Sequence, residues 1–167
     1  MTLRVLGIDP GLACTGWGLI ESDGSRHRHV DHGVIETEAD GSAAERLLLL
    51  HGEIARIIAA FGPSGMGIET LFFTKNISSA IPVAQARGVV LLSAAQAGLR
   101  VGEFSPVTIK QSVVGAGGAD KAQVQEMVRL LLGLQEIPRP DHAADALAAA
   151  ITFVHHGDSW STASAVS

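Results

Sequence analysis

The sequence predicts a single α/β domain whose sheet has five strands, three antiparallel and two parallel, with helices on both faces. Three observations support this prediction: three strand-like segments joined by short turns open the chain, alternating strand and helix patterns follow, and the remainder is helical. A chain of 167 residues is also long enough to bury one core. We assign residues 1–156 to the domain and expect residues 157–167 to form a frayed tail.

The opening strands are rich in Val, Ile and Leu and end at Pro-Gly and Asp-Gly-Ser breaks. Because the connections between them are short, each strand is expected to pair with the next in an antiparallel hairpin. Their expected bounds are 3–9, 15–22 and 27–36.

The rest of the chain alternates between helix and strand and then becomes helical. A helix is expected over 43–61, where Leu and Ile recur at helical spacing and where Ser42 and Glu45 can form a capping box. A second helix, over 77–98, would hold Pro82 in or near its first turn. The other expected elements are strands at 65–70 and 100–104, and helices that open at Ser105, at Asp120 with Gln123 completing a capping box, and at Pro140 with an end near His155.

The composition excludes several classes of protein. Hydrophobic residues make up 47% of the chain and charged residues 17%, which is typical of an ordered globular protein. Cys14 is the only cysteine and cannot form an internal disulfide, and no basic leader with an apolar segment and a cleavage site is seen. The apolar stretches are too short and too interrupted to span a bilayer. We therefore expect a cytoplasmic protein with no membrane partner.

Charge is unevenly distributed along the chain, although the net charge is only -5. Residues 1–69 hold 5 Lys and Arg against 10 Asp and Glu, residues 70–140 hold 7 against 4, and residues 141–167 hold none against 3. A basic middle between acidic ends fits a polyanion-binding surface beside a carboxylate-rich site. Taken alone, so modest an asymmetry is better explained as ordinary scatter of surface charge.

Two carboxylates stand where buried strands end. Asp9 closes the first apolar run before a Pro-Gly turn, and Glu69 lies at the end of the strand expected at 65–70. In sheets of this kind, sites gather at the carboxyl ends of the strands, where the loops open a crevice. Either residue alone could equally be a turn former or a helix cap.

The last helix supplies two further candidates. His142 and Asp145 are three residues apart and therefore lie on one helical face. Asp145 is flanked by Ala and Leu, so we expect it to be partly buried, and burying an ion is costly unless a partner or metal compensates it. Asp141 follows Pro140 in the first turn, where an aspartate commonly caps the helix and interacts with its dipole.

If Asp9, Glu69, His142 and Asp145 converge, they form a site for divalent cations. Three close carboxylates repel one another unless their pKa values rise or cations hold them together. Oxygen ligands favour Mg²⁺, which is usually shared with substrate phosphate. Two such ions, about 4 Å apart, can activate a water and stabilise the leaving oxygen in an in-line displacement at phosphorus. Phosphodiester hydrolysis is the reaction that suits this chemistry.

Five blocks of the sequence, in order, resemble the RuvC family of bacterial Holliday junction endonucleases, whose fold is RNase H-like. They read GIDPG…TGWG, IETLFFTKN, AQARGVV, IKQSVVGAGGADKAQVQ…VRLLL and DHAADALAAAI. The similarity extends from Leu3 to His155, which is nearly the whole chain. A lone GIDPG is a weak signal, whereas several blocks that agree in order and spacing are very specific.

The resemblance implies a homodimer that binds a four-way DNA junction and nicks two strands symmetrically in recombination and repair, in association with a RuvAB-type branch-migration complex. By position, Asp9, Glu69 and Asp145 match the family's metal-binding carboxylates, and His142 falls where members carry aspartate or histidine. An imidazole in place of a hard carboxylate should shift the preference from Mg²⁺ toward Mn²⁺. Asp141 is not the matching position, although it could support the site as an outer group.

The same blocks imply contacts with DNA. Phe72 matches an aromatic that stacks on bases at the opened junction, as aromatic rings can do for any base; core packing is the alternative for Phe72 or its neighbour Phe73. Lys110 and Lys121 match positions that contact DNA near the cut or stabilise the transition-state phosphate, which makes Lys121 a candidate catalytic residue. Taken singly, each lysine is more commonly a solvated surface charge. The other predicted contacts in these blocks are Lys75, Asn76 and Arg87.

Other functions share parts of this pattern. A kinase or ATPase can also open with a strand, an aspartate and a glycine-bearing hairpin, but it needs two related domains, for which 167 residues without an internal repeat leave no room. An RNase H-like nuclease that acts on RNA–DNA hybrids is a second alternative. A junction-binding module with an inactive site is the third.

Overall fold

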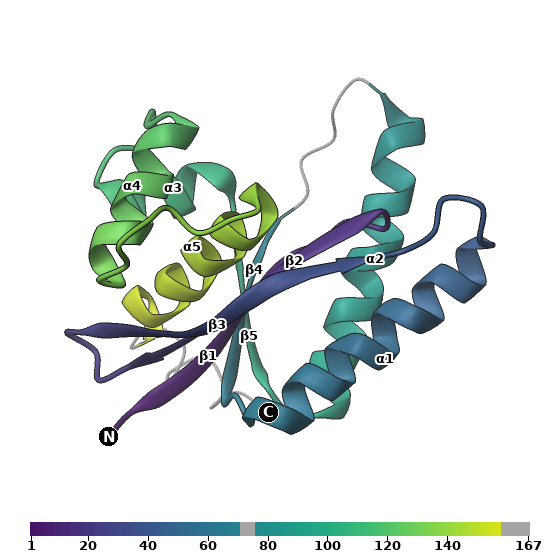
Figure 1. Cartoon of the computed structure of the whole chain (residues 1–167), viewed down its shortest axis with the longest axis horizontal. Helices are drawn as coiled ribbons and strands as arrows, with labels where there is room; N and C mark the ends of the chain where they lie inside the picture. The colour runs from purple at the N-terminus through teal and green to yellow at the C-terminus, as the bar shows by residue number, and fades with distance from the viewer. Residues whose placement is uncertain (71–75, 158–167) are drawn as a thin grey trace, which may run out of the picture.

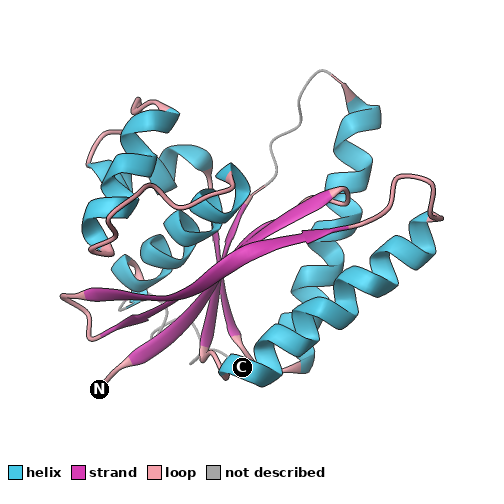
Figure 2. Cartoon of the chain, viewed as in Figure 1, coloured by secondary structure: helices cyan, strands magenta, loops and turns pink. Residues whose placement is uncertain are grey.

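The computed structural model describes residues 1–70 and 76–157. The described residues form one mixed sheet and the helices that cover it (Figures 1 and 2). In chain order the elements are β1 (Leu3–Asp9), β2 (Cys14–Ser22), β3 (His27–Glu36), α1 (Ala43–Phe61), β4 (Gly65–Glu69), α2 (Ile77–Gln96), β5 (Arg100–Phe104), α3 (Pro106–Val114), α4 (Lys121–Leu131) and α5 (Asp141–His155).

The sheet confirms the predicted fold class. Its strand order is β3-β2-β1-β4-β5, with β1–β2 and β2–β3 antiparallel and β1–β4 and β4–β5 parallel. Helices α3, α4 and α5 lie on one face, and α1 and α2 lie on the other (Figure 1). The two opening hairpins therefore provide the antiparallel half, and the strand–helix alternation provides the parallel half.

The two capping boxes predicted from the sequence are present. Ser42 and Glu45 form a capping box at α1, and Asp120 and Gln123 form one at α4. Ser105 accepts a hydrogen bond from the Thr108 backbone N–H at the start of α3. Each cap satisfies a donor that the first helical turn leaves unpaired.

Helix α2 holds Pro82 near its first turn, as predicted, and differs from expectation in one respect. Pro82 is the sixth residue of the helix, just beyond the first turn, where it has no N–H to donate to the preceding turn. The difference is that the helix is, by length and composition alone, long and apolar enough to cross a membrane, with a mean hydropathy of 1.3, which the sequence analysis excluded for every segment. Its inner face packs in the core through Ala86, Val90 and Ala94, as a helix of a globular domain does.

The core is divided between the two faces of the sheet. Leu147, Ile151 and Phe153 of α5 pack with residues of α3 and α4 on one face. On the other face, the apolar sides of α1 and α2 pack against alternate residues of the strands, including Leu6 and Ile8 of β1. Because successive strand residues face opposite ways, Asp9 faces the α5 side together with Gly7.

Glycines allow α5 to lie directly on the strands. A Cβ atom at Gly7 would stand 1.7 Å from the Ala146 carbonyl oxygen, and one at Gly67 would stand 2.3 Å from the Ala149 carbonyl oxygen. A larger residue at either position would push the helix away from the sheet. This close approach places the first turns of α5 over the ends of β1 and β4, where Asp9 and Glu69 lie.

Candidate active site

Two neighbouring parallel strands bring Asp9 and Glu69 to one edge of the sheet. Ile8 of β1 pairs with Ile68 of β4, so the next residue of each strand is one of the two carboxylates. Gly67 and Glu69 face the α5 side, as Gly7 and Asp9 do, because strand residues alternate. Strand order and strand period therefore account for half of the predicted site.

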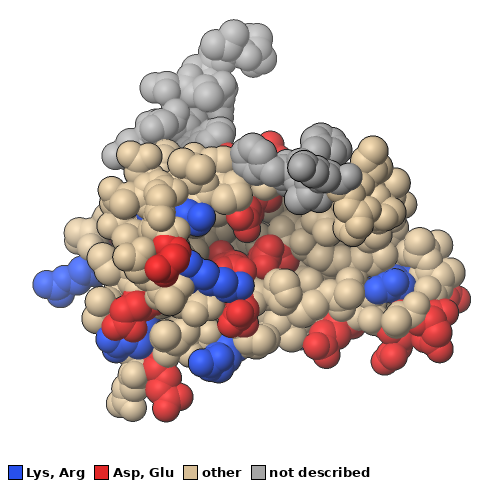
Figure 3. Space-filling model, turned by 90° about the horizontal axis from the view of Figure 1, so that it is seen from above, with Lys and Arg blue, Asp and Glu red and all other residues tan. Residues whose placement is uncertain are grey.

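Helix α5 supplies the other two residues of the cluster, His142 and Asp145. His142 Nδ1 lies 2.8 Å from Asp9 Oδ2, across 133 residues of sequence. Among the described residues, ligand atoms of Asp9, His142 and Asp145 all lie within 4.8 Å of one another, a spacing that suits a shared cation. The side chains of Asp9 and Asp145 are 17% and 29% exposed, whereas His142 is 53% exposed. Figure 3 shows acidic side chains near the middle of this side of the molecule, with basic ones beside them.

The turn that follows Asp9 is held by Thr15, a residue that the sequence analysis did not select. Its hydroxyl donates to the Gly11 carbonyl at 2.5 Å and accepts from the Gly11 N–H at 3.2 Å. The side chain is fully buried. Its place in the TGWG block was the available signal. Thr15 therefore ties β2 to the turn that directs Asp9 into the site.

Electrostatic strain accompanies the convergence. Burial, together with the charges of Asp9 and Asp145, raises the pKa of Glu69 to about 7. Burial and the charge of Asp9 raise the pKa of Asp145 to about 6. Both shifts disfavour the ionised carboxylates, and bound divalent cations would favour the ionised form of each group.

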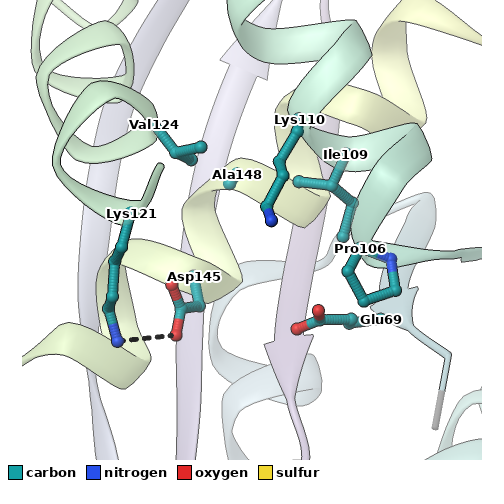
Figure 4. Close-up of a pocket in the computed structure, with 8 residues that line it drawn as sticks. All are labelled: Glu69, Pro106, Ile109, Lys110, Lys121, Val124, Asp145 and Ala148. Atoms are coloured by element: carbon teal, nitrogen blue, oxygen red, sulfur yellow. Dashed lines mark ion pairs between the residues drawn. The ribbon is translucent and has the colours of Figure 1, made fainter. Parts of the chain in front are cut away.

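Two lysines that the family resemblance links to DNA, Lys110 and Lys121, lie beside these acids. A cavity of about 280 Å³ is lined by Glu69, Asp145, Lys110 and Lys121, with apolar residues of α3 and α4 behind them. In Figure 4 the Glu69 carboxylate points toward Asp145, and Lys110 enters the space between them. Lys121 Nζ lies 3.8 Å from Asp145 Oδ2. The cavity therefore combines the acidic cluster with the cations that a phosphate group would meet.

Asp141 does not cap α5, contrary to the sequence-based interpretation. The N-cap position is Pro140, and no side-chain hydrogen bond caps the helix. Asp141 Oδ2 lies 3.3 Å from Lys121 Nζ, and its other oxygen accepts from Gln125 Nε2. The hydrogen bond from Lys121 lowers the pKa of Asp141. The tertiary contact with α4 thus outweighs the local one.

The other predicted DNA contacts differ in their exposure and in their partners. Asn76 is exposed at the start of α2, where its side-chain oxygen accepts from the Ser78 hydroxyl at 2.6 Å. Arg87 is only 17% exposed and is ion-paired with Glu103. Phe72, Phe73 and Lys75 lie outside the described residues, so the predictions for them stand as predictions.

Comparison with known proteins identifies the family. The model of the family described as crossover junction endodeoxyribonuclease RuvC matches residues 5–153. The chain belongs to the RuvC family. A RuvC from Treponema denticola is 54% identical over 154 residues, which cover 92% of this chain and 86% of that protein. A RuvC from Roseiflexus is 55% identical over 148 residues, covering 89% of this chain and 88% of that protein.

Solved structures agree with this assignment. The structure of Thermus thermophilus RuvC in complex with a Holliday junction substrate matches with a TM-score of 0.89 and 36% identity, covering 93% of this chain and 94% of that one. The yeast mitochondrial Holliday junction resolvase Ydc2, at 14% identity, has the same fold with a TM-score of 0.66, covering 92% of this chain and 79% of that one. The fold is therefore RNase H-like, and the enzyme class is that of the RuvC endodeoxyribonucleases.

Proposed function

We propose that this protein is a metal-dependent endonuclease that resolves Holliday junctions by paired, symmetric nicks. The observation that carries the proposal is the convergence of Asp9, His142 and Asp145 within 4.8 Å at the sheet edge, with Glu69 beside them. The relative from Thermus thermophilus, whose structure was solved with a Holliday junction substrate, shares the fold over nearly the whole chain.

The donor set fits divalent cations, and Asp9, Glu69, His142 and Asp145 would hold them. If two Mg²⁺ or Mn²⁺ ions bind there, their charge would activate a water and stabilise the leaving oxygen. Asp9 orients His142 through the 2.8 Å contact with Nδ1, which leaves Nε2 free to face a ligand. Lys110 and Lys121 attract the phosphate of the strand to be cut.

Lys121 has a second role in the protein without DNA. Burial lowers its pKa, but the carboxylates of Asp145, Asp141 and Asp9 outweigh that effect and raise it, so Lys121 stays charged. It thereby acts as an internal counter-ion for Asp145. When cations and DNA enter the site, we expect the Lys121 ammonium group to turn toward the transition-state phosphate. The ion pair with Asp141 holds Lys121 at the edge of the site.

A homodimer fits the requirement for two nicks. The outer face of α2 carries Ile77, Ile81 and Leu92, which are 69%, 53% and 53% exposed. Exposed apolar residues along one helix favour association with another protein surface. Light scattering should give twice the chain mass. The proposal also includes stacking of Phe72 on an opened base, DNA contacts by Lys75 and Asn76, a RuvAB-type partner complex and a cytoplasmic location.

The decisive experiment compares a synthetic four-way junction, a linear duplex and an RNA–DNA hybrid, with and without Mg²⁺ or Mn²⁺. We expect cleavage of the junction alone, and only with metal. The Asp9→Asn variant keeps the side-chain shape and removes the charge, so it should bind the junction and fail to nick it. Cleavage of the hybrid alone would favour an RNase H-like activity, and binding without cleavage would favour an inactive junction-binding module.

A further inference from the structure

Arg87 reaches the active-site strand from the opposite face of the sheet. It belongs to α2, whereas His142 and Asp145 belong to α5 on the other face (Figure 1). Its Nη1 donates to the Glu69 carbonyl oxygen at 3.1 Å, and its Nη2 is ion-paired with Glu103 of β5. One guanidinium therefore joins α2 to the ends of two parallel strands.

The Glu69 carbonyl lacks a partner within the sheet on the side of β1. The Thr70 N–H donates to the Phe104 carbonyl of β5 at 2.7 Å. Since successive strand residues direct their backbone groups to alternate neighbours, the Glu69 carbonyl is directed toward β1. The next residue of β1 there is Pro10, which has no N–H to donate. Arg87 supplies the missing donor.

We propose that Arg87 is a positioning residue for the cleavage reaction, which holds the backbone of Glu69 so that its carboxylate faces Asp9 and Asp145. This inference rests on the proposed function. Glu69 is the last residue of β4, and the ladder between β1 and β4 ends one residue earlier, at Ile68. Pairing with β5 continues through Glu69 and Phe104, so the hydrogen bond from Arg87 replaces only the missing pairing with β1, at the residue where the direction of the side chain matters most.

The environment of Arg87 favours positioning over a contact with DNA. The side chain is only 17% exposed, and both terminal nitrogens have protein partners. Glu103 offsets its charge, which reduces the attraction that a phosphate would feel. Arg87 lines a hollow of about 210 Å³ together with Asp9, Pro10 and Glu69. Arg87 therefore supports the residues of the site from within the protein.

The two bonds of Arg87 require a planar guanidinium. A lysine would retain the charge, but a single ammonium group cannot reach two acceptors in the same fixed geometry. Arg87→Lys should therefore restore function in part, whereas Arg87→Met, which has similar bulk and no donor, should not. Glu103→Gln removes the ion-pair partner while leaving Arg87 and Glu69 intact, and so loosens the guanidinium.

The test separates positioning from DNA binding with the full chain. Junction affinity is measured by fluorescence anisotropy in Ca²⁺, the single-turnover cleavage rate in Mg²⁺, and Mn²⁺ binding without DNA by calorimetry. For Arg87→Met we expect junction affinity within about twofold of wild type, a cleavage rate lower by about tenfold or more, and weaker Mn²⁺ binding.

The other variants grade the effect. Arg87→Lys should be intermediate in cleavage rate, and Glu103→Gln should cleave more slowly with unchanged junction affinity. Arg56→Met, which removes an exposed arginine of α1 paired with Glu53, is the matched control.

Three results would overturn the inference: an Arg87→Met variant that cleaves at the wild-type rate, one whose loss is entirely in junction affinity, or a Glu103→Gln variant that binds DNA more tightly because it frees a cation. If Arg87→Met fails to fold, the Lys and Glu103→Gln variants decide. If wild type cleaves no junction, the proposed function fails instead, and the Mn²⁺ titration still decides whether Arg87 positions Glu69.

Discussion

Replacing Glu69 by glutamine should stabilise the metal-free protein at alkaline pH. The pKa of the Glu69 carboxyl is raised from 4.5 to about 7, first by burial and then by Asp9 and Asp145. Between these two values the folded protein retains a proton that the unfolded chain has lost, so stability falls as the pH rises through that window and the loss is complete above pH 7. At about 1.4 kcal/mol per pKa unit, the full effect is about 3 kcal/mol, and solvent screening at this partly exposed group reduces it to about 1–3 kcal/mol.

The assay is urea denaturation of wild type and Glu69→Gln in EDTA at pH 4 and pH 8. We expect the variant to be more stable by about 1–3 kcal/mol at pH 8 and equal to wild type at pH 4, where both side chains are neutral. Glu38→Gln, at an exposed position outside the site, is the control and should change little at either pH. Addition of Mg²⁺ should then stabilise wild type more than Glu69→Gln, because a bound ion compensates the carboxylates only where they remain.

Equal stability of the two proteins at pH 8 would refute the electrostatic reasoning. So would a stabilisation of the same size at both pH values, since that would come from packing and not from ionisation. Loss of stability in the variant at pH 8 would mean that the carboxylate has a favourable partner in the folded state.

Two further changes test other parts of the structure. Gly7→Ala should cost at least about 3 kcal/mol of folding free energy or prevent folding, because its Cβ would stand 1.7 Å from the Ala146 carbonyl oxygen. Gly52→Ala in α1 is the control: its Cβ would meet nothing within 4 Å, so it should be neutral or stabilising by about 0.5–1 kcal/mol. Thermal melts of the two variants and wild type measure the difference. His142→Asp should move the ratio of cleavage rates toward Mg²⁺ because a hard anionic oxygen replaces an imidazole, and wild type should cleave at least as well with Mn²⁺ as with Mg²⁺. Metal titrations at saturation measure this ratio, and a clear preference of wild type for Mg²⁺ would contradict the reasoning.

Local patterns in the sequence were sufficient for most of the fold. The capping boxes at Ser42 and Asp120 and the hairpin breaks are each decided within a few residues, by hydrogen bonds and backbone geometry that tertiary contacts do not alter. The period of two in β1 and the helical period in α5 likewise define which side chains face the core. Asp9 and Asp145 could be selected because each is an acid in an apolar segment.

Roles that depend on distant partners could not be predicted in the same way. Asp141 looked like a cap by its place in the first turn, yet Lys121 of α4 binds it. Arg87 was predicted as a DNA contact from the sequence block that contains it, and the structure adds bonds to Glu103 and to the Glu69 carbonyl. In both cases the deciding partner belongs to another element, and nothing in the local pattern identifies it.

The sequence by itself therefore determined the strands, the helices, the RuvC family pattern and the four side chains of the candidate site. Only the tertiary structure decided how these side chains meet, because the approach of α5 over Gly7 and Gly67 is a matter of atomic contact between elements far apart in the chain. The same close packing buries Glu69 and Asp145 beside Asp9, and so produces the raised pKa values that cations would relieve.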